Sequence, residues 1–471
     1  MSTTASSSLA RPALFSTRKM VHISMLGFAF LLPFLTWSEA VGAAMLALLF
    51  NMFVLPRLGA DLDKPMVRAV SRAIAGPAGE PPSVAEMFAG PWTGIVIYPI
   101  SVLVLILIFR RHMEIAAGAW AIMALGDGLA SVVGGALGGP VLPYNSEKTW
   151  TGFGAFIIAG AAGAWVLTRW VAPSVPSKYA LTVCLATAVV GALVEGVPMG
   201  LDDNLTVPLA SGCFMYCAYL IEGSALSSNL PYLGVRLALA IPINLAFALA
   251  ALRLRTLNRS GAAVGFALGV LVYLGWGWKS FALLLAFFLL GSLSTRAGFR
   301  QKMSRGIAEH RGGARSWREA LANGVAPAFF SVLVLATHRE AAFLLALVAS
   351  LGEAAGDTVS SEIGEWLSPQ AYLVTTFTRV PAGENGGVSL AGTAAGIAAS
   401  AVIVALGYAL GLCRAGLPGA VAALAAAIAG NLFDSLLGAT LERRSLVTNG
   451  IVNFTGAAFA GALAFVWMLG R

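Results

Sequence analysis

The chain has 471 residues, of which 58% are hydrophobic and only 11% are charged, and its mean hydropathy is +0.81. About a quarter of the residues of a soluble domain are charged. This composition therefore excludes a soluble enzyme, a disordered chain and a basic nucleic-acid-binding domain. It predicts an all-α integral membrane protein whose apolar segments cross a bilayer. The formal net charge of +8 is interpreted as loop charge that sets orientation.

Residues 1–19 are rich in Ser, Thr and Ala and are predicted to be a cytoplasmic tail that carries Arg11, Arg18 and Lys19. The apolar run after this tail is interpreted as the start of a transmembrane hairpin rather than a signal peptide, because a second apolar run follows at once. A plastid transit peptide is the alternative that the Ser-rich start leaves open.

Hydropathy predicts about fifteen membrane spans. Their approximate centres are residues 29, 47, 100, 122, 160, 190, 214, 244, 268, 286, 328, 348, 400, 427 and 460. Two polar stretches interrupt them, a Pro-rich loop at 57–90 and a basic loop at 296–318. Placing the N-terminus in the cytoplasm puts both loops there too, as the positive-inside rule requires, with Arg110–Arg111 as one violation.

An acidic residue inside an apolar membrane helix costs free energy and usually has a function. In this chain such acids lie in similar motifs that occur in the same order in both halves. The segments Gly126–Gly134 and Gly356–Gly364 both read G-D-x-x-small-Ser-x-x-Gly. Three later pairs share one constant separation, which differs by a single position from that of the two aspartates: Lys148 and Arg379, Gly152 and Gly383, and Asp203 and Asp434. The constant offset indicates an internal duplication. Corresponding motifs of the two halves lie eight predicted spans apart. Because eight is an even number, the two repeats are predicted to have parallel topology, with both sets of motifs on the cytoplasmic face.

Aspartates at helix ends, nearby glycines and a basic loop residue are typical of a site for a nucleotide phosphate and Mg²⁺. The predicted catalytic residues are Asp127, Lys148, Asp203, Asp357, Glu362, Arg379 and Asp434. The predicted metal ligands among them are Asp127, Asp203, Asp357 and Asp434. The predicted cofactor-binding residues are Gly126, Gly128, Gly134, Thr149, Gly152, Asn204, Gly356, Ser361, Gly383, Asn385, Gly386, Gly387 and Ser435. Glu195 either joins the first site or caps a packed helix end.

Neither a Walker A sequence nor the protein-kinase motif set is present, so a kinase here would have a different fold. Two other interpretations stay open. The acids could pair with Lys or Arg across the bundle or line a cation path. The chain could also be a transporter with parallel repeats, although its polar boxes lie at predicted span ends rather than at midplane.

The first half resembles the CTP-dependent phytol kinase and dolichol kinase family over roughly residues 20–225. The matching motifs are Gly126-Asp127-Gly128-Leu129-Ala130, Lys148-Thr149-Trp150-Thr151-Gly152 and Asp203-Asn204-Leu205-Thr206-Val207-Pro208. Thr151 stands where that family has Glu. The second half resembles the phytyl-phosphate kinase group of multi-pass membrane proteins over roughly residues 235–471. Its matching stretches are Asn258–Gly261, Gly275–Trp278, Trp317–Gly324, Gly356–Gly364, Val380–Ser389, Asp434–Thr440 and Asn449–Phe454.

These resemblances imply a fusion of two kinase-like membrane domains, at 20–230 and 231–471. The first would phosphorylate phytol or a related isoprenoid alcohol, and the second would convert the monophosphate to the diphosphate. CTP would be the donor, Mg²⁺ the cofactor, and the product would feed tocopherol, phylloquinone or chlorophyll synthesis. The implied location is a bacterial inner membrane or a plastid membrane, with both sites facing the cytoplasm or stroma. A chain with only one catalytic half is the remaining alternative.

Overall fold

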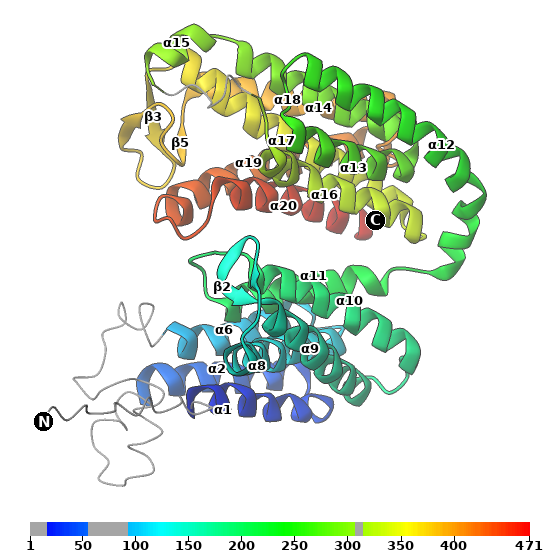
Figure 1. Cartoon of the computed structure of the whole chain (residues 1–471), viewed down its shortest axis with the longest axis vertical. Helices are drawn as coiled ribbons and strands as arrows, with labels where there is room; N and C mark the ends of the chain where they lie inside the picture. The colour runs from blue at the N-terminus through cyan, green and yellow to red at the C-terminus, as the bar shows by residue number, and fades with distance from the viewer. Residues whose placement is uncertain (1–16, 55–92, 307–313) are drawn as a thin grey trace, which may run out of the picture. The chain divides into compact units, whose positions relative to one another are not determined.

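The computed structural model describes residues 17–54, 93–306 and 314–471, and these form two compact units that divide between Tyr219 and Leu220 (Figure 1). The predicted Pro-rich loop at 57–90 and residues 1–16 of the predicted tail lie outside the described residues. Each unit contains a helical bundle and a small antiparallel sheet.

The first unit begins with helices, and a pair of short strands follows its helix α8. In chain order its elements are α1 (Thr17–Ser24), the 3-10 helix η1 (Met25–Phe34), α2 (Trp37–Leu49), the π-helical turn η2 (Phe50–Val54), α6 (Thr93–Ile108), α7 (Met113–Ala121), the π-helical turn η4 (Ile122–Asp127), α8 (Gly128–Leu137), β1 (Val141–Leu142), β2 (Asn145–Thr149), α9 (Trp150–Val171), α10 (Ser177–Gly196) and α11 (Asp203–Tyr219). The segment α7–η4–α8 is one continuous apolar helix.

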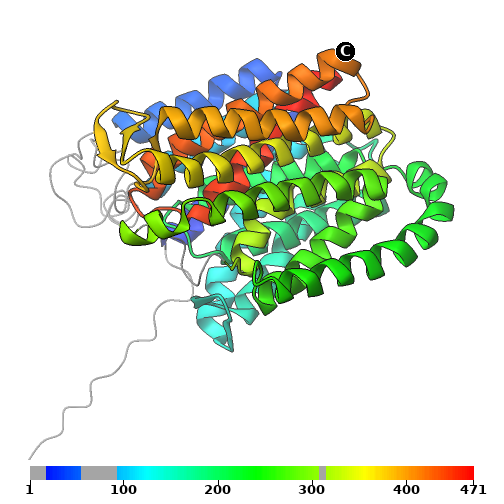
Figure 2. The same cartoon turned by 90° about the horizontal axis from the view of Figure 1, so that it is seen from above.

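The second unit has longer helices and a three-stranded sheet of order β4-β3-β5. Its elements are α12 (Gly223–Arg253), α13 (Arg259–Trp276), α14 (Trp278–Arg296), α15 (Phe299–Ser304), α16 (Trp317–Ala336), α17 (Glu340–Leu367), β3 (Gln370–Leu373), β4 (Arg379–Pro381), β5 (Gly387–Val388), α18 (Leu390–Ala409), α19 (Gly416–Leu437), the π-helical turn η6 (Gly438–Glu442) and α20 (Asn449–Leu469). Figure 2 shows the sheet projecting from one end of this bundle.

The prediction of a multi-span helical membrane protein is confirmed. Within the described residues, twelve helices are long and apolar enough to cross a membrane. All fifteen predicted span centres fall inside helices. The three predicted spans outside the twelve are shorter helices, at Lys19–Phe34, Gly94–Ile108 and the 17-residue α11.

Helix α17 is the central helix of the second unit. It packs against α14, α16, α18, α19 and α20, and every residue from Ala342 to Gly356 is buried. Its sequence is apolar on all sides over most of that stretch, as expected for a helix surrounded by other helices. The acidic box therefore lies on the best-enclosed helix of this unit.

A hydroxyl cap starts the helix that follows each sheet. The Thr149 hydroxyl accepts a hydrogen bond from the Gly152 N–H at 3.2 Å to begin α9. The Ser389 hydroxyl accepts one from the Gly392 N–H at 3.1 Å to begin α18. A Cβ atom at either glycine would lie 3.0 Å or less from a carbonyl oxygen of the acid-bearing helix. Glycine at this position therefore permits the close helix–helix contact.

This correspondence revises the constant offset predicted from the sequence. By its place in the fold, Gly392 is the counterpart of Gly152, whereas the offset predicted Gly383. The reason lies in the connections: α8 and α9 are joined by the segment 138–149, but α17 and α18 are joined by the longer segment 368–389. The longer connection holds the larger sheet, so the offset between the two units increases after the acidic box.

The later acids also correspond differently between the two units from what the constant offset predicted. Glu195 lies near the C-terminus of α10, and Asp434 lies near the C-terminus of α19, which is the equivalent helix in chain order. Asp203 instead opens the next helix, α11, whose counterpart α20 opens with Asn449. Position in the fold thus matches Asp434 with Glu195 rather than with Asp203.

Candidate functional sites

Three carboxylates from three helical segments converge in the first unit. Asp127 ends the π-helical turn η4, Glu195 lies near the end of α10, and Asp203 opens α11. One oxygen of each carboxylate lies within 4.8 Å of an oxygen of the other two. A cluster of carboxylate oxygens with this spacing fits a divalent cation such as Mg²⁺. The structure thus brings together the predicted Asp127 and Asp203, and it adds Glu195, which the sequence left open.

Lys148, on strand β2, lies among these acids. Its ammonium group forms an ion pair with Glu195 and lies 3.5 Å from Oδ2 of Asp203. Partial burial disfavours the charged amine, but the hydrogen bond and the charge of Glu195, with the charge of Asp203, outweigh it and raise the pKa of Lys148. Lys148 therefore stays protonated at neutral pH and offsets part of the negative charge of the cluster.

The β1–β2 hairpin positions Lys148 against the helix ends. The Asn145 side chain donates a hydrogen bond to the Gly196 carbonyl at 3.0 Å, which joins the hairpin to the end of α10. Asn204, next to Asp203, has a buried side-chain oxygen with no hydrogen-bond partner among the described residues. Buried polar atoms are normally satisfied, so this oxygen is a further candidate ligand atom.

The other glycines predicted for the first site, and Thr149, make contacts within and between helices. A Cβ atom at Gly126 would lie 2.9 Å from the Phe156 ring, and one at Gly134 would lie 3.0 Å from the Thr149 hydroxyl. The residues with this packing role are Gly126, Gly128, Gly134, Thr149 and Gly152. Thr151 donates a hydrogen bond to the Gly138 carbonyl and so fixes the end of α8 to the start of α9.

A polar cavity of about 190 Å³ lies in the second unit, at the end of α17. The predicted site residues that line it are Asp357, Ser361, Gly383, Asn385, Gly386, Gly387, Asp434 and Ser435. The lining also includes Asn431, Glu442 and Asn449, which were not among the predicted site residues. Asn431 and Glu442 share the helical face of Asp434, at spacings of three and eight positions, which is the signal that could have included them.

The Gly383–Gly387 segment folds across the ends of α17 and α19. Gly386 has a φ of 72°, and a Cβ atom there would collide with the backbone of Ala439 in η6. Glu384 forms an ion pair with Arg443 at 3.3 Å, which holds the segment against the end of η6. Glycine is therefore required at Gly386 both by its backbone angle and by this close approach.

Two further acids of this unit are buried, Asp434 of α19, which lines the cavity, and Glu353 of α17, which does not. Asp434 is 8% exposed and Glu353 is 1% exposed. Oδ2 of Asp434 and Oε1 of Glu353 have no hydrogen-bond partner among the described residues, and neither does the amide nitrogen of Asn431. A buried carboxylate without a partner is costly, so Asp434, which lines the cavity, is a candidate cation ligand.

Three predicted residues of the second site lie outside the cavity lining. Glu362 is buried and forms an ion pair with Lys302 of α15, which is itself 1% exposed. Arg379 is exposed on strand β4. Gly356 packs against α18, where a Cβ atom would lie 3.3 Å from the Gly396 carbonyl. The structure therefore gives Glu362 a structural partner and does not bring Arg379 to the cavity.

Residues 242–462 match the family described as "Integral membrane protein DUF92". The chain is 37% identical to an uncharacterised membrane protein of Synechocystis over 42% of this chain and 80% of that protein. It is 35% identical to protein VTE6, chloroplastic, of Arabidopsis thaliana over 45% of this chain and 65% of that protein. It is 29% identical to a "Probable phytol kinase, chloroplastic" of Triticum aestivum over 44% of this chain and 68% of that protein. No solved structure matches.

Proposed function

The chain belongs to the DUF92 family of integral membrane proteins, and on that premise we propose that it is a membrane-embedded prenol kinase. Relatives named as phytol kinases support this class of reaction. The observation that carries the proposal is the carboxylate cluster of Asp127, Glu195 and Asp203, with Lys148 paired to it. Acids that can hold a metal beside a cation are the parts that phosphoryl transfer requires.

In the first unit, the hydroxyl oxygen of phytol or a related prenol attacks the γ-phosphorus of CTP. The bond between that phosphorus and the bridging oxygen breaks, CDP leaves, and the hydroxyl proton passes to a carboxylate of the cluster. Asp127, Glu195 and Asp203 would hold Mg²⁺, which would supply positive charge to offset that of the phosphate groups. Lys148 adds a second positive charge next to the transferred group.

The second unit adds the second phosphate. An oxygen of the prenyl monophosphate attacks the γ-phosphorus of a second CTP, and CDP again leaves. Asp357 and Asp434 are the metal ligands that we assign, while the Gly383–Gly387 segment offers backbone N–H groups to the nucleotide phosphates. The chain would thus be bifunctional, and both sites would face the cytoplasm or stroma, where CTP is available.

A direct test uses membranes that contain the full chain, incubated with Mg²⁺ and γ-labelled CTP or ATP. Phytol, geranylgeraniol and dolichol are supplied in separate reactions, and labelled mono- and diphosphates are separated. We expect phytyl monophosphate first and then the diphosphate, with CTP as the better donor. A matched preparation that carries both Asp127→Asn and Asp434→Asn is the control. Absence of both products in the unmodified chain, with every alcohol and both nucleotides, would rule out the proposal.

A parallel-repeat transporter is the rival function. It requires polar residues that face a translocation path. In sealed vesicles it would move a labelled substrate without forming a phosphate ester. The two functions therefore differ in the chemical identity of the recovered lipid.

A further inference from the structure

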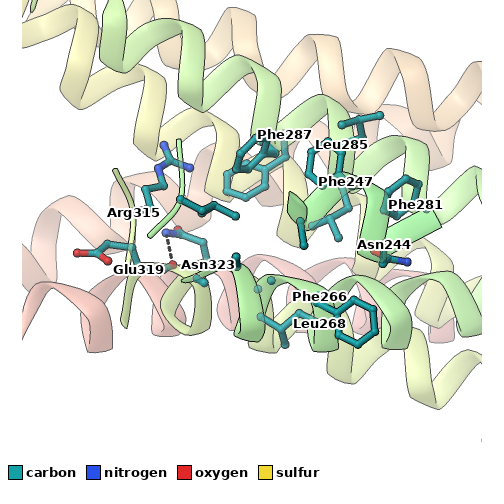
Figure 3. A pocket seen from close by; sticks show the side chains of 18 residues that line it. Asn244, Phe247, Phe266, Leu268, Phe281, Leu285, Phe287, Arg315, Glu319 and Asn323 are labelled. Carbon is teal, nitrogen blue, oxygen red and sulfur yellow. Dashed lines mark hydrogen bonds between the residues drawn. The ribbon is translucent and has the colours of Figure 1, made fainter. Parts of the chain in front are cut away.

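A second kind of pocket lies between α12, α13, α14 and α16 of the second unit (Figure 3). Its walls are mostly aromatic and aliphatic. The apolar lining residues are Phe247, Ala248, Leu257, Ala262, Phe266, Leu268, Phe281, Leu284, Leu285, Phe287, Phe288 and Ala320. The cavity has a volume of about 80 Å³, so such a lining fits a segment of a hydrocarbon chain.

Asn244 lies at the end near Phe281, where its side-chain nitrogen donates to the Ala240 carbonyl, and a larger polar group lies at the other end. Figure 3 shows Arg315, Glu319 and Asn323 together there, at the opposite end from Phe281. Asn323 is 8% exposed, and its side-chain nitrogen donates a hydrogen bond to the Glu319 carbonyl at 3.1 Å. Its side-chain oxygen has no partner among the described residues. The Glu319 carboxylate accepts hydrogen bonds from Ser316 at the start of α16, so it serves the helix cap.

Backbone hydrogen bonds hold the main chain of Arg315 in place. Its N–H donates to the Thr256 carbonyl at 3.0 Å, and its carbonyl accepts from the Asn258 N–H at 3.1 Å. Its side chain passes over Gly291, where a Cβ atom would lie 2.6 Å from one guanidinium nitrogen. Within the described part of the chain, the guanidinium makes no hydrogen bond or ion pair, although its charge interacts with those of Glu319 and Asp357. A rigidly placed cation is therefore available for a ligand.

Arg315 also lines an adjoining cavity with Arg255 and Arg296. Three arginines thus line a cavity that shares Arg315 with the apolar pocket, and the Arg296 guanidinium donates a hydrogen bond to the Leu254 carbonyl at 3.0 Å. Arginine suits phosphate recognition, because its planar group can donate two parallel hydrogen bonds. The combination of an apolar pocket and a cluster of arginines is complementary to an amphiphile with one hydrocarbon chain and an anionic head.

We propose that this pocket binds the isoprenoid chain of a prenyl monophosphate and that Arg315, with Arg255 and Arg296, binds its phosphate. The inference rests on the proposed function, because the prenyl monophosphate is the substrate of the second step. It extends that function by placing the substrate chain between α13 and α14 and its head on the Asp357 side. A neutral prenol has no anionic group for the arginines to bind. A phospholipid has two hydrocarbon chains, whereas the lining residues form a single pocket.

Binding is measured without any nucleotide, so that the result does not depend on kinase activity. The purified full chain in detergent is titrated with geranylgeranyl monophosphate, geranylgeraniol, isopentenyl monophosphate and phosphatidic acid. We expect geranylgeranyl monophosphate to bind at least about tenfold more tightly than each of the others. Equal binding of phosphatidic acid and geranylgeranyl monophosphate would show a general lipid site and overturn the proposal.

Two variants separate the head from the chain. Arg315→Gln should weaken binding of geranylgeranyl monophosphate about tenfold and leave geranylgeraniol unchanged, because only the phosphate loses a partner. Gly265→Leu should weaken geranylgeranyl monophosphate by a similar factor and leave isopentenyl monophosphate unchanged. Gly265 lines the pocket, and the nearest atom to a Cβ there, Leu257 Cδ1, is 3.6 Å away, so the larger side chain fills free space.

Gly234→Leu is the matched control, because a Cβ at this glycine of α12 has no atom within 4 Å and Gly234 does not line the pocket. It should bind all four probes as the unmodified chain does. Crosslinking of the unmodified chain with a benzophenone-tagged prenyl monophosphate needs no variant, and labelled peptides should come from α13 or α14. Labelling elsewhere alone would refute the chain site. Correct labelling in a chain that makes no phosphate ester would instead reject only the proposed kinase reaction.

Discussion

The two carboxylate sites share an order of elements but differ in charge balance. In the first unit, Lys148 precedes the helix-capping Thr149 and pairs with the acids. In the second unit, Val388 stands before the capping Ser389, and the residues that line the cavity include five acids and no Lys or Arg. A site without its own cation depends more on a bound one. If both sites act as proposed, the second should therefore depend more strongly on bound metal than the first, which has Lys148.

The largest expected effect separates the two sites. Asp127→Asn should lower alcohol phosphorylation by about 10²–10³-fold and leave conversion of supplied monophosphate intact, and Asp434→Asn should do the reverse. The reason is that each carboxylate belongs to one unit only. Product analysis of both steps checks this, with thermal stability measured on the same samples. Loss of both steps in either single variant would show one shared site.

The next effect concerns stability rather than chemistry. Glu362→Ala leaves the Lys302 ammonium buried without its partner, so we expect a loss of about 3–5 kcal/mol in the free energy of unfolding. Replacing the pair together, as Lys302→Met with Glu362→Leu, should recover most of it. Denaturation in detergent measures both. If Glu362→Ala keeps full stability but loses the second step, Glu362 is catalytic, as its place in the acidic box predicted.

Removal of the lysine tests the first site. Lys148→Met should lower alcohol phosphorylation by about tenfold to a hundredfold. Because the pKa of Lys148 is raised above its ordinary value of 10.5, its contribution to stability is full below that value and is lost as the pH rises through the raised pKa. The Tm difference between Lys148→Met and the unmodified chain should therefore be constant from about pH 7 to about pH 9 and shrink above about pH 10.5. A difference that already vanishes near neutral pH would contradict a protonated Lys148.

Metal titration compares the two steps directly. The second step should need several-fold more free Mg²⁺ for half-maximal rate, because the polar cavity assigned to the nucleotide has no basic side chain in its lining, and Arg315 lines only the separate pockets assigned to the prenyl phosphate. Chelation should stop the second step before the first. Lys148→Met should move the first step toward the metal requirement of the second. Identical titration curves for both steps would contradict the expected difference in metal dependence between the two sites.

The smallest effect is expected at Arg379. The sequence predicts it as a catalytic cation, but it is exposed on β4 outside the cavity lining. We therefore expect Arg379→Gln to change the rate of the second step less than about twofold, as for other exposed charges. Arg444→Gln is a control at another exposed arginine. A loss above tenfold at Arg379 alone would show that the hairpin closes over the cavity during catalysis.

The helices and most of the polar motifs could be predicted from the sequence, because both depend on local composition and spacing. Asp127 and Asp357 were found from one repeated motif. Glu195 stayed open, since an acid at a helix end has the same sequence signal whether it binds a metal or caps the helix. The pairing of Asp434 with Asp203 failed because a constant offset cannot detect a longer sheet connection. The ion pair of Glu362 was missed because its partner, Lys302, lies on a separate helix far away in the sequence.

The burial of α17 has a consequence for membrane insertion during synthesis. This helix carries Glu353 and Asp357 within a span, and an acid at the centre of an inserting helix costs about 2.5–3.5 kcal/mol on the translocon scale. Three of the helices that enclose it, α18, α19 and α20, are synthesised after it. The ribosome therefore completes α17 before the helices that will bury its acidic residues have been made. Retention of this segment near the insertion machinery until α20 emerges would avoid exposing the acids to lipid, so the order of biogenesis is constrained by Glu353 and by Asp357, the residue that we also assign as a metal ligand.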